Sequence, residues 1–509
     1  MSTEEAKQSN EATATVAQAD EVTPAPVEPK LAKLVSAGKV VGVFTTLGIT
    51  SIALLGASAI TFSADLWLSS GAKYARADKA TLPVVSQASL PEHSYLLGCI
   101  PYFPDAKGAP AGSASTQVFS VEGTTITGVK PAVAGKSPLI SSGFTGGRKL
   151  SGIEPLIVGV STQNTSSFTG NSLVASSSET LKGITTSACQ VARNHHWFVA
   201  GNTDVGEATF LTVLNPSANA TQVTLQAWNS TSKFAHTPTL TIPANSAQTV
   251  NLATYFPGEA RLGVHASVTG PGAVIALHSS GDSGLATRGM ETVSAVETPS
   301  KENVFTGIET SETDTRIRIL NPGNEPATAT IEVVDPLGTN VLPGAKDIEI
   351  AGSAVFELDL GGIGKGMKTI ILRSNQPLVA NVSAAYEGGD KEDAQIIADR
   401  TIWSKANQVF QLKAQVPPLQ TGEKSRQLAI YNPANTAIKL QLNGKEVQIP
   451  RNSQLTFEAN GETVEIDSAH PVYASLLIKR IEGKTTLVTR LELEDPRVAL
   501  PPLQVRVGN

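Results

Sequence analysis

The chain has 509 residues, too many for a single hydrophobic core, so several domains are expected. Its 39 lysines and arginines against 45 aspartates and glutamates give a net charge of -6, which argues against nucleic acid as a partner because phosphate binding needs a basic surface. Only 17% of the residues are charged, whereas glycine and proline number 43 and 30; this turn-rich composition predicts an all-β protein.

The first 62 residues predict a tail and a membrane anchor. Residues 1–39 carry few large apolar side chains and are expected to form a disordered cytoplasmic tail. Residues 40–62 contain no charge and are numerous enough to cross a membrane as one helix. Lys39 and two further lysines precede this run, which places the N-terminus in the cytoplasm and the bulk of the chain outside the cell. The alternative is a cleaved signal peptide, because Ala57-Ser58-Ala59 has the pattern of a cleavage site.

A stalk and a β-rich domain are expected after the anchor. Residues 63–90 form the predicted stalk, and residues 91–195 contain short predicted strands between loops rich in glycine and serine. The only two cysteines, Cys99 and Cys189, lie near the ends of this domain. Outside the cell such a pair is expected to form one disulfide, and the alternative is two buried thiols.

A repeat organises the rest of the chain into the units 196–302, 303–407 and 408–509. Each unit has about 100 residues of short alternating strands with turn signals, which is typical of an immunoglobulin-like β-sandwich. The alternative, a β-propeller, has blades that repeat at about 40–50 residues. Each unit carries an Asn-Pro phrase directly after a predicted strand: Leu214-Asn215-Pro216, Leu320-Asn321-Pro322 and Tyr431-Asn432-Pro433.

Together these features resemble an uncharacterised family of actinobacterial cell-envelope proteins, known as a domain of unknown function. The resemblance rests on the anchor, on Cys99-Ile100-Pro101, and on Cys189 followed by Trp197-Phe198. It also rests on the family's repeated Leu-x-Asn-Pro phrase, which corresponds here to Leu214-Asn215-Pro216. The resemblance implies a protein of the actinobacterial cell envelope and no catalytic residue.

Three motifs that suggest chemistry have simpler structural interpretations. Gly281-Asp282-Ser283-Gly284 is similar to the nucleophile loop of a serine protease, but the equivalent segments of the other units are predicted hairpin turns. The glycine-rich residues 361–366 lack the hydroxyl residue of a phosphate-binding loop. His195 and His196 are adjacent but have no further ligand at metal-binding spacing, so neither a metal nor a cofactor is expected.

Arg288, Arg400 and Arg490 are the candidate binding residues, because they recur near the ends of the three units at what the sequence indicates is one point of the repeat. Three equivalent arginines would suit an acidic envelope polymer. The alternative is structural: each arginine pairs with a carboxylate or packs its stem on a sheet.

The expected function is binding rather than catalysis. We expect a non-enzymatic, single-pass protein of the cell envelope that binds an envelope polymer or a partner protein through its extracellular tandem β-domains. The alternative is an envelope glycan-processing enzyme or an accessory subunit of one, with a carboxylate pair contributed by residues 80–195.

Overall fold

Strands make up nearly all the regular secondary structure of this protein, as the sequence predicts. In the computed structural model, the residues described are 93–493 without 106–107, 109, 111, 121–122, 163–167, 179–180, 283–286, 311–313, 362, 388–396, 418–422 and 483–484. They all belong to one unit of the chain, Ser89–Asn509. Among them there is no α-helix, and the short 3-10 turn η1 (Leu252–Thr254) is the one helical element.

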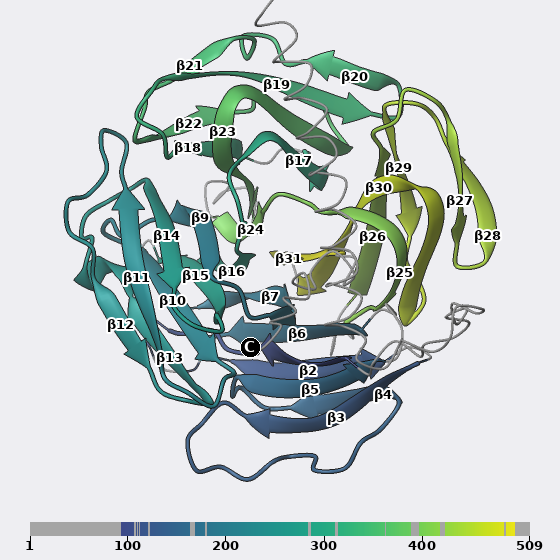
Figure 1. The fold of residues 1–509 in the computed structure, drawn as a ribbon. Coiled ribbons are helices and arrows are strands. Elements are labelled where there is room, and N and C mark those ends of the chain that lie inside the picture. The colour runs from purple at the N-terminus through teal and green to yellow at the C-terminus, as the bar shows by residue number, and fades with distance from the viewer. Residues whose placement is uncertain are drawn as a thin grey trace, which may run out of the picture. The chain divides into compact units, whose positions relative to one another are not determined.

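The strands fall into four groups, called modules 1 to 4 (Figure 1). Module 1 comprises β1 (His93–Cys99), β2 (Ser113–Ser120), β3 (Thr124–Pro131), β4 (Gly146–Ser151), β5 (Leu156–Thr162), β6 (Phe168–Ser177), β7 (Lys182–Ala188) and β8 (Gln190–Val191). Module 2 comprises β9 (His195–Gly201), β10 (Glu207–Asn215), β11 (Thr221–Trp228), β12 (Thr239–Ile242), β13 (Ser246–Asn251), β14 (Leu262–Val268), β15 (Val274–Asp282) and β16 (Thr287–Ser294).

The two later modules each contain one very long strand. Module 3 comprises β17 (Ser300–Glu309), β18 (Asp314–Asn321), β19 (Ala327–Asp335), β20 (Gly338–Val341), β21 (Ile348–Ile350), β22 (Ala354–Asp359), β23 (Met367–Glu387) and β24 (Ile397–Trp403). Module 4 comprises β25 (Gln408–Gln415), β26 (Glu423–Asn432), β27 (Ile438–Leu442), β28 (Lys445–Ile449), β29 (Ser453–Glu458), β30 (Thr463–Glu482) and β31 (Thr485–Glu492). The long strands β23 and β30 each correspond to β14 and β15 joined end to end.

All four modules share one strand order, and this includes module 1. In module 2 the antiparallel sheets are β13-β10-β15-β16 and β12-β11-β14-β9. Modules 3 and 4 repeat both orders around β23 and β30. Module 1 has β4-β2-β6-β7 and β3-β5-β1-β8, which match strand for strand except that β12 has no counterpart and β8 is added. The sequence interpretation that residues 91–195 stand outside the repeat therefore misses a fourth copy of the same topology.

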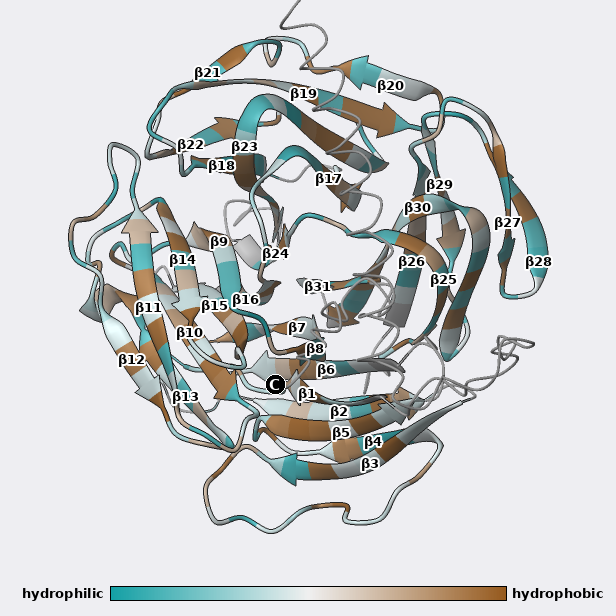
Figure 2. Cartoon of the chain, in the orientation of Figure 1, coloured by the Kyte–Doolittle hydropathy of each residue, from teal (hydrophilic) through white to brown (hydrophobic). Residues whose placement is uncertain are grey.

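The core of each module lies between its two sheets. In module 2, Leu211 and Leu277 from one sheet and Leu225 and Val264 from the other have no exposed surface and belong to one apolar cluster. Alternate residues of each strand point into this core, and bands of opposite hydropathy alternate along β11 (Figure 2). Because each module holds two packed sheets, it differs from the single four-stranded sheet of a propeller blade.

The repeated asparagines hold the two sheets of modules 2, 3 and 4 together. Each is buried, and its amide nitrogen donates to the carbonyl four residues later and to a carbonyl at the end of a strand in the other sheet. Its oxygen accepts the N–H two residues later, which closes a turn around the proline that follows the asparagine. The strand-end carbonyls belong to Ile242, Ile350 and Ile449. The phrase is therefore structural.

Contacts between the modules close into a ring. The outer face of the first sheet of each module packs on the preceding module, through clusters centred on Leu214, Leu320 and Tyr431. Leu173 and Ile184 of module 1 complete the ring by joining the core of module 4. The last strand of the first sheet in each module, β7, β16, β24 and β31, neighbours its counterparts in the adjoining modules, and Figure 1 shows these strands near one another.

The predicted membrane anchor, stalk and tail lie outside the described residues. Residues 40–62 therefore remain a prediction. Within residues 93–493, in the part that the structure describes, no helix has the length and apolar character needed to cross a membrane.

Candidate functional site

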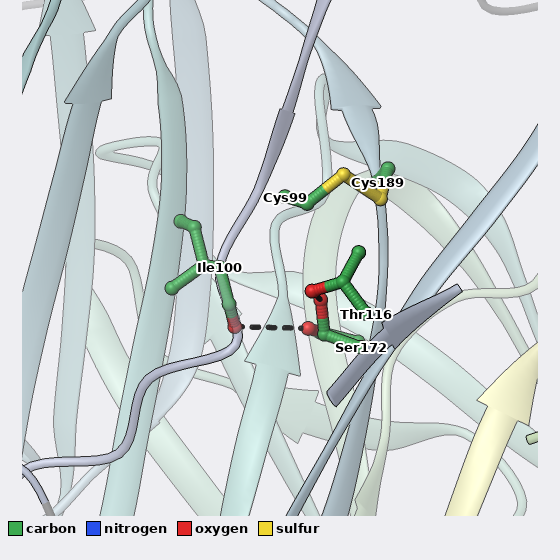
Figure 3. Close-up of a disulfide and its surroundings, with 6 residues drawn as sticks. Cys99, Ile100, Thr116, Ser172 and Cys189 are labelled. Carbon is green, nitrogen blue, oxygen red and sulfur yellow. Dashed lines mark hydrogen bonds between the residues drawn. A yellow bond between two sulfur atoms is a disulfide. The ribbon is translucent and has the colours of Figure 1, made fainter. Parts of the chain in front are cut away.

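The disulfide between Cys99 and Cys189 is confirmed. Its Sγ atoms lie 2.00 Å apart, and it links the end of β1 to the residue between β7 and β8, 90 positions later (Figure 3). Next to it, the hydroxyl of Ser187 donates to the carbonyl of Ile100 at 3.3 Å. Cys189 follows β7, which lies in the sheet opposite β1, and precedes β8, which pairs with β1. The bond therefore fixes the point where the chain crosses from one sheet of module 1 to the other.

A polar cavity of about 400 Å³ lies where module 2 meets module 3. Its walls come from β9, β10 and β15 on one side and from β18, β22, β23 and β24 on the other. This volume falls within the range of about 300–1,000 Å³ typical of small-ligand sites. Six charged residues line it: Glu207, Asp314, Arg316, Arg318, Glu357 and Arg400.

Ion pairs fix the charged side chains of the cavity. Arg400 Nη2 lies 3.0 Å from Glu207 Oε2, which bridges the two modules. Arg318 Nη2 lies 2.7 Å from Glu357 Oε2, and its Nη1 donates at 2.6 Å to the carbonyl of Gly201 in module 2. The half-exposed Arg316 pairs with Asp314 at 2.9 Å and with Glu357 at 3.7 Å. Each arginine thus has its carboxylate partner, and the wall is preorganised.

The cavity exists because small residues occupy a position that is filled in the neighbouring modules. Strand pairing makes His278, Ser383 and Leu477 equivalent, because each pairs with the residue five positions before the repeated asparagine of its module. His278 is fully buried against Phe103, and Leu477 is buried in the core cluster of module 3. Ser383 and the adjacent Ala384 and Ala385 leave the same space open.

The three predicted arginines do not form one equivalent set. Val379 and Tyr473 are equivalent, because each pairs with the first residue of the asparagine-proline phrase of its module. Arg400 pairs with the residue six positions after Val379, whereas Arg490 pairs with the residue four positions after Tyr473. These two arginines are therefore two positions apart in the repeat. Arg400 lines the cavity. Arg288 lies in β16, and its side chain is outside the described residues.

Arg490 lies in a buried polar cluster between the central strands. Its side chain is 3% exposed, Nη1 lies 2.9 Å from Glu492 Oε1, and Nε donates to the carbonyl of Ile402 in β24. The carboxylate of Glu291 in β16 faces Arg490 and accepts hydrogen bonds from Thr185 and Thr401, both at 2.6 Å. These contacts connect all four modules and give Arg490 a structural position.

Asp399 in β24 binds the backbone of three modules in the same cluster. Its carboxylate accepts the N–H groups of Met290 in module 2 and Val488 in module 4, besides its own neighbour Arg400. Burial raises the pKa of Asp399 well above its usual range, and the N–H donors act against this rise.

Gly289 has a φ of +80°, and a Cβ there would lie 2.5 Å from the backbone nitrogen of Arg400, so only glycine fits beside Asp399.

Stability is expected to fall as the pH rises from about 4.5 to 7, because of Glu291. Burial raises the pKa of Glu291 from 4.5 to about 7, with Arg490 and three hydrogen bonds opposing the rise. In that pH range the unfolded carboxyl ionises while the folded one keeps its proton, which costs about 3 kcal/mol. Glu291→Gln, which stays neutral, should lose this component of the pH dependence. Urea unfolding of both proteins at pH 5 and pH 8 measures it, and equal pH dependences would contradict the assignment.

One known protein family matches a large part of the chain. The sequence pattern of a family of unknown function, DUF5719, matches residues 153–467, more than half of the chain. The chain belongs to the DUF5719 family. None of the curated proteins matches the sequence. The expected membership of an uncharacterised family is confirmed, whereas an actinobacterial origin stays a prediction.

The DUF5719 match contains every charged residue of the cavity. It also contains Cys189 and Asp399, but Cys99 and Arg490 lie outside it. Sequence reasoning found Arg400 and missed the other five charged residues. One signal was present in the sequence: Arg316 and Arg318 alternate in a strand whose equivalents in the other modules are Phe210, Thr212, Gln427 and Ala429.

The protease-like, glycine-rich and histidine motifs of this DUF5719 chain form no common site in the part that the structure describes. Residues 283 and 284 of the protease-like segment, and residue 362 of the glycine-rich segment, lie outside the described part of the chain. His195 Nδ1 lies 3.2 Å from His265 Nε2 on the neighbouring strand, whereas His196 is buried and its Nε2 is hydrogen-bonded to the carbonyl of Arg193. In the described residues no group of three or more histidine, cysteine or acidic side chains is placed to hold a metal ion.

Proposed function

We propose that this protein is a non-enzymatic, membrane-anchored protein of the cell envelope that binds an envelope polymer or a partner protein through four tandem immunoglobulin-like β-sandwiches. The uncharged residues 40–62, preceded by lysines, support the anchor and the external location of the modules. The disulfide supports the same location, because such bonds persist in oxidising compartments.

The observation that carries the binding function is the cavity between modules 2 and 3. Its charged groups are held by ion pairs and backbone carbonyls before any ligand arrives, so little side-chain entropy is lost on binding. The seams around His278 and Leu477 are filled, whereas this one is open. The carboxylates in it, Glu207, Asp314 and Glu357, come from outside residues 80–195, and each is paired with arginine, which favours positioning of a ligand over acid catalysis.

Arg316→Ala is expected to weaken binding of the full chain to isolated cell-wall material about ten-fold. Arg316 is the most exposed arginine of the cavity, with 47% of its side chain accessible, and one charge-assisted hydrogen bond contributes about 1.5–3 kcal/mol. The measurement is co-sedimentation of the detergent-solubilised protein with insoluble wall from the source organism, together with crosslinking to envelope proteins.

The matched control is Arg451→Ala, an exposed arginine in the turn between β28 and β29, which should bind like the wild type. Recovery of neither wall material nor any envelope protein by the wild-type chain would contradict the proposed function.

A further inference from the structure

We propose that the cavity between modules 2 and 3 binds a neutral carbohydrate through its hydroxyl groups, and that it is not an anion site. This inference rests on the proposed function and names the class of ligand that the cavity takes. It replaces the expectation, drawn from three arginines in the sequence, that the ligand is acidic.

The charge of the cavity is balanced. Three arginines, Arg316, Arg318 and Arg400, face three carboxylates, Glu207, Asp314 and Glu357. Two further charged residues near the wall, Arg261 and Asp359, have opposite signs and leave the balance unchanged. Arg261 lies 3.6 Å from Glu357, and Asp359 interacts electrostatically with Arg316. An anionic ligand would have to be held close to three carboxylates without excess positive charge, which is unfavourable in a partly desolvated site.

Each guanidinium group already binds a carboxylate, and of the donors on Arg318 and Arg400 the buried Nε of Arg400 is left without a hydrogen-bond partner. Arg318 contacts Glu357 and two backbone carbonyls, those of Gly201 and Ala260. Arg400 is bound to Glu207 across the seam. A phosphate or carboxylate ligand that bound both N–H groups on one side of a guanidinium would displace the protein carboxylate there. The displaced carboxylate would be buried without a partner, which is costly.

A hydroxyl group suits this arrangement. It donates one hydrogen bond and accepts others at the same oxygen, so it can bridge a carboxylate and the guanidinium paired with it without breaking the pair. The same cavity is lined by two such pairs, Arg400 with Glu207 and Arg318 with Glu357, and Arg316 lies beside the second pair. Ser279 and Ser383 add hydroxyl groups, and Ala384, Ala385 and Ile402 add small apolar patches for the carbon face of a sugar ring.

The decisive variant fills the cavity without changing its charge. Ser383→Leu places at this position the residue found at the equivalent position of module 4, Leu477. Ala385→Leu occupies the same space from the next position on that face of β23. Ser137→Leu, at an exposed site in the loop between β3 and β4, is the matched control. Thermal unfolding of each variant shows whether it is folded.

The test uses oligosaccharides released from the envelope of the source organism and separated by anion exchange into a neutral and an acidic pool. The full chain in detergent micelles is immobilised and challenged with each pool and with envelope peptides. We expect retention of the neutral pool, a loss of at least ten-fold in Ser383→Leu and Ala385→Leu, and no change in Ser137→Leu. A ten-fold increase in salt should alter this retention less than about two-fold, because the ligand is uncharged.

Three results would overturn the inference: preferential retention of the acidic pool, retention of peptides alone, or retention of the neutral pool that the filled variants keep. The last result, with cell-wall binding intact, would refute the cavity as the carbohydrate site and leave the proposed function standing. Absence of wall binding and of envelope partners in the wild type would refute both.

Discussion

Replacing Cys99 with serine is expected to lower the free energy of unfolding by about 4–5 kcal/mol, the value that the chain-entropy model gives for a loop of this length. The disulfide closes 90 residues that hold both sheets of module 1. Without it the unfolded chain gains the entropy of that loop, while the folded module keeps only a small apolar cluster around Val118, Val158 and Val160. Urea unfolding followed by far-ultraviolet circular dichroism, which reports the strands of all modules, measures the change.

Limited proteolysis locates the effect of Cys99→Ser. Cleavage is expected first within residues 93–191, while modules 2, 3 and 4, which each have their own core, stay protected longer. Cys189→Ser and the double variant should match the single variant, because they remove the same bond. If thiol labelling of the unfolded, unreduced wild type finds two free thiols, the disulfide and the predicted export are both contradicted.

Replacing Arg490 with methionine is expected to destabilise the protein by about 3–5 kcal/mol, the range seen when one partner of a buried ion pair is removed. Methionine fills a similar volume, so the loss is mainly electrostatic. It leaves Glu492 and Glu291 without their cation and frees the carbonyl of Ile402. The loss should grow as the pH rises through about 7, because Arg490 lowers the pKa of Glu291, and without this cation the buried carboxyl ionises at a higher cost.

The control for Arg490→Met is Arg451→Met on the exposed turn, which should change the stability by no more than about 0.5 kcal/mol. Adding Glu291→Gln to Arg490→Met should recover part of the loss, since it removes one unpaired charge. Thermal unfolding at pH 6 and pH 8 measures all four proteins. If Arg490→Met is as stable as Arg451→Met, the central cluster does not hold the modules together.

The sequence reveals the fold better than it reveals the site. Alternating strands and the asparagines at 215, 321 and 432 identify three copies, because a buried amide between two sheets recurs as a visible motif. Module 1 lacks this asparagine and the strand equivalent to β12, so its likeness lies in strand pairing that no motif records. The disulfide is predictable because only two cysteines are present.

The candidate site depends on the register of the strands and on pairs of residues far apart in the chain, and neither can be read from one sequence. A shift of two positions separates Arg400 from Arg490, and it takes one to a cavity and the other to a buried cluster. Glu207 and Arg400 are 193 residues apart and meet only because modules 2 and 3 pack together. The cavity also arises because Ser383 is smaller than His278 and Leu477. These three positions can be recognised as equivalent only from the strand pairing of the folded protein.

The closed contacts among the four modules make the assembly indivisible. In a linear repeat protein each unit touches only its neighbours, so units can be added or lost at the ends and folding can spread from any point. Here module 1 packs on module 4 through the hydrogen bond from Thr186 N to Thr489 Oγ1, so no module is terminal and each has two interfaces. The number of copies is therefore fixed. Module 1 is also the first to be synthesised and the last to have both interfaces covered, because one of them requires β31.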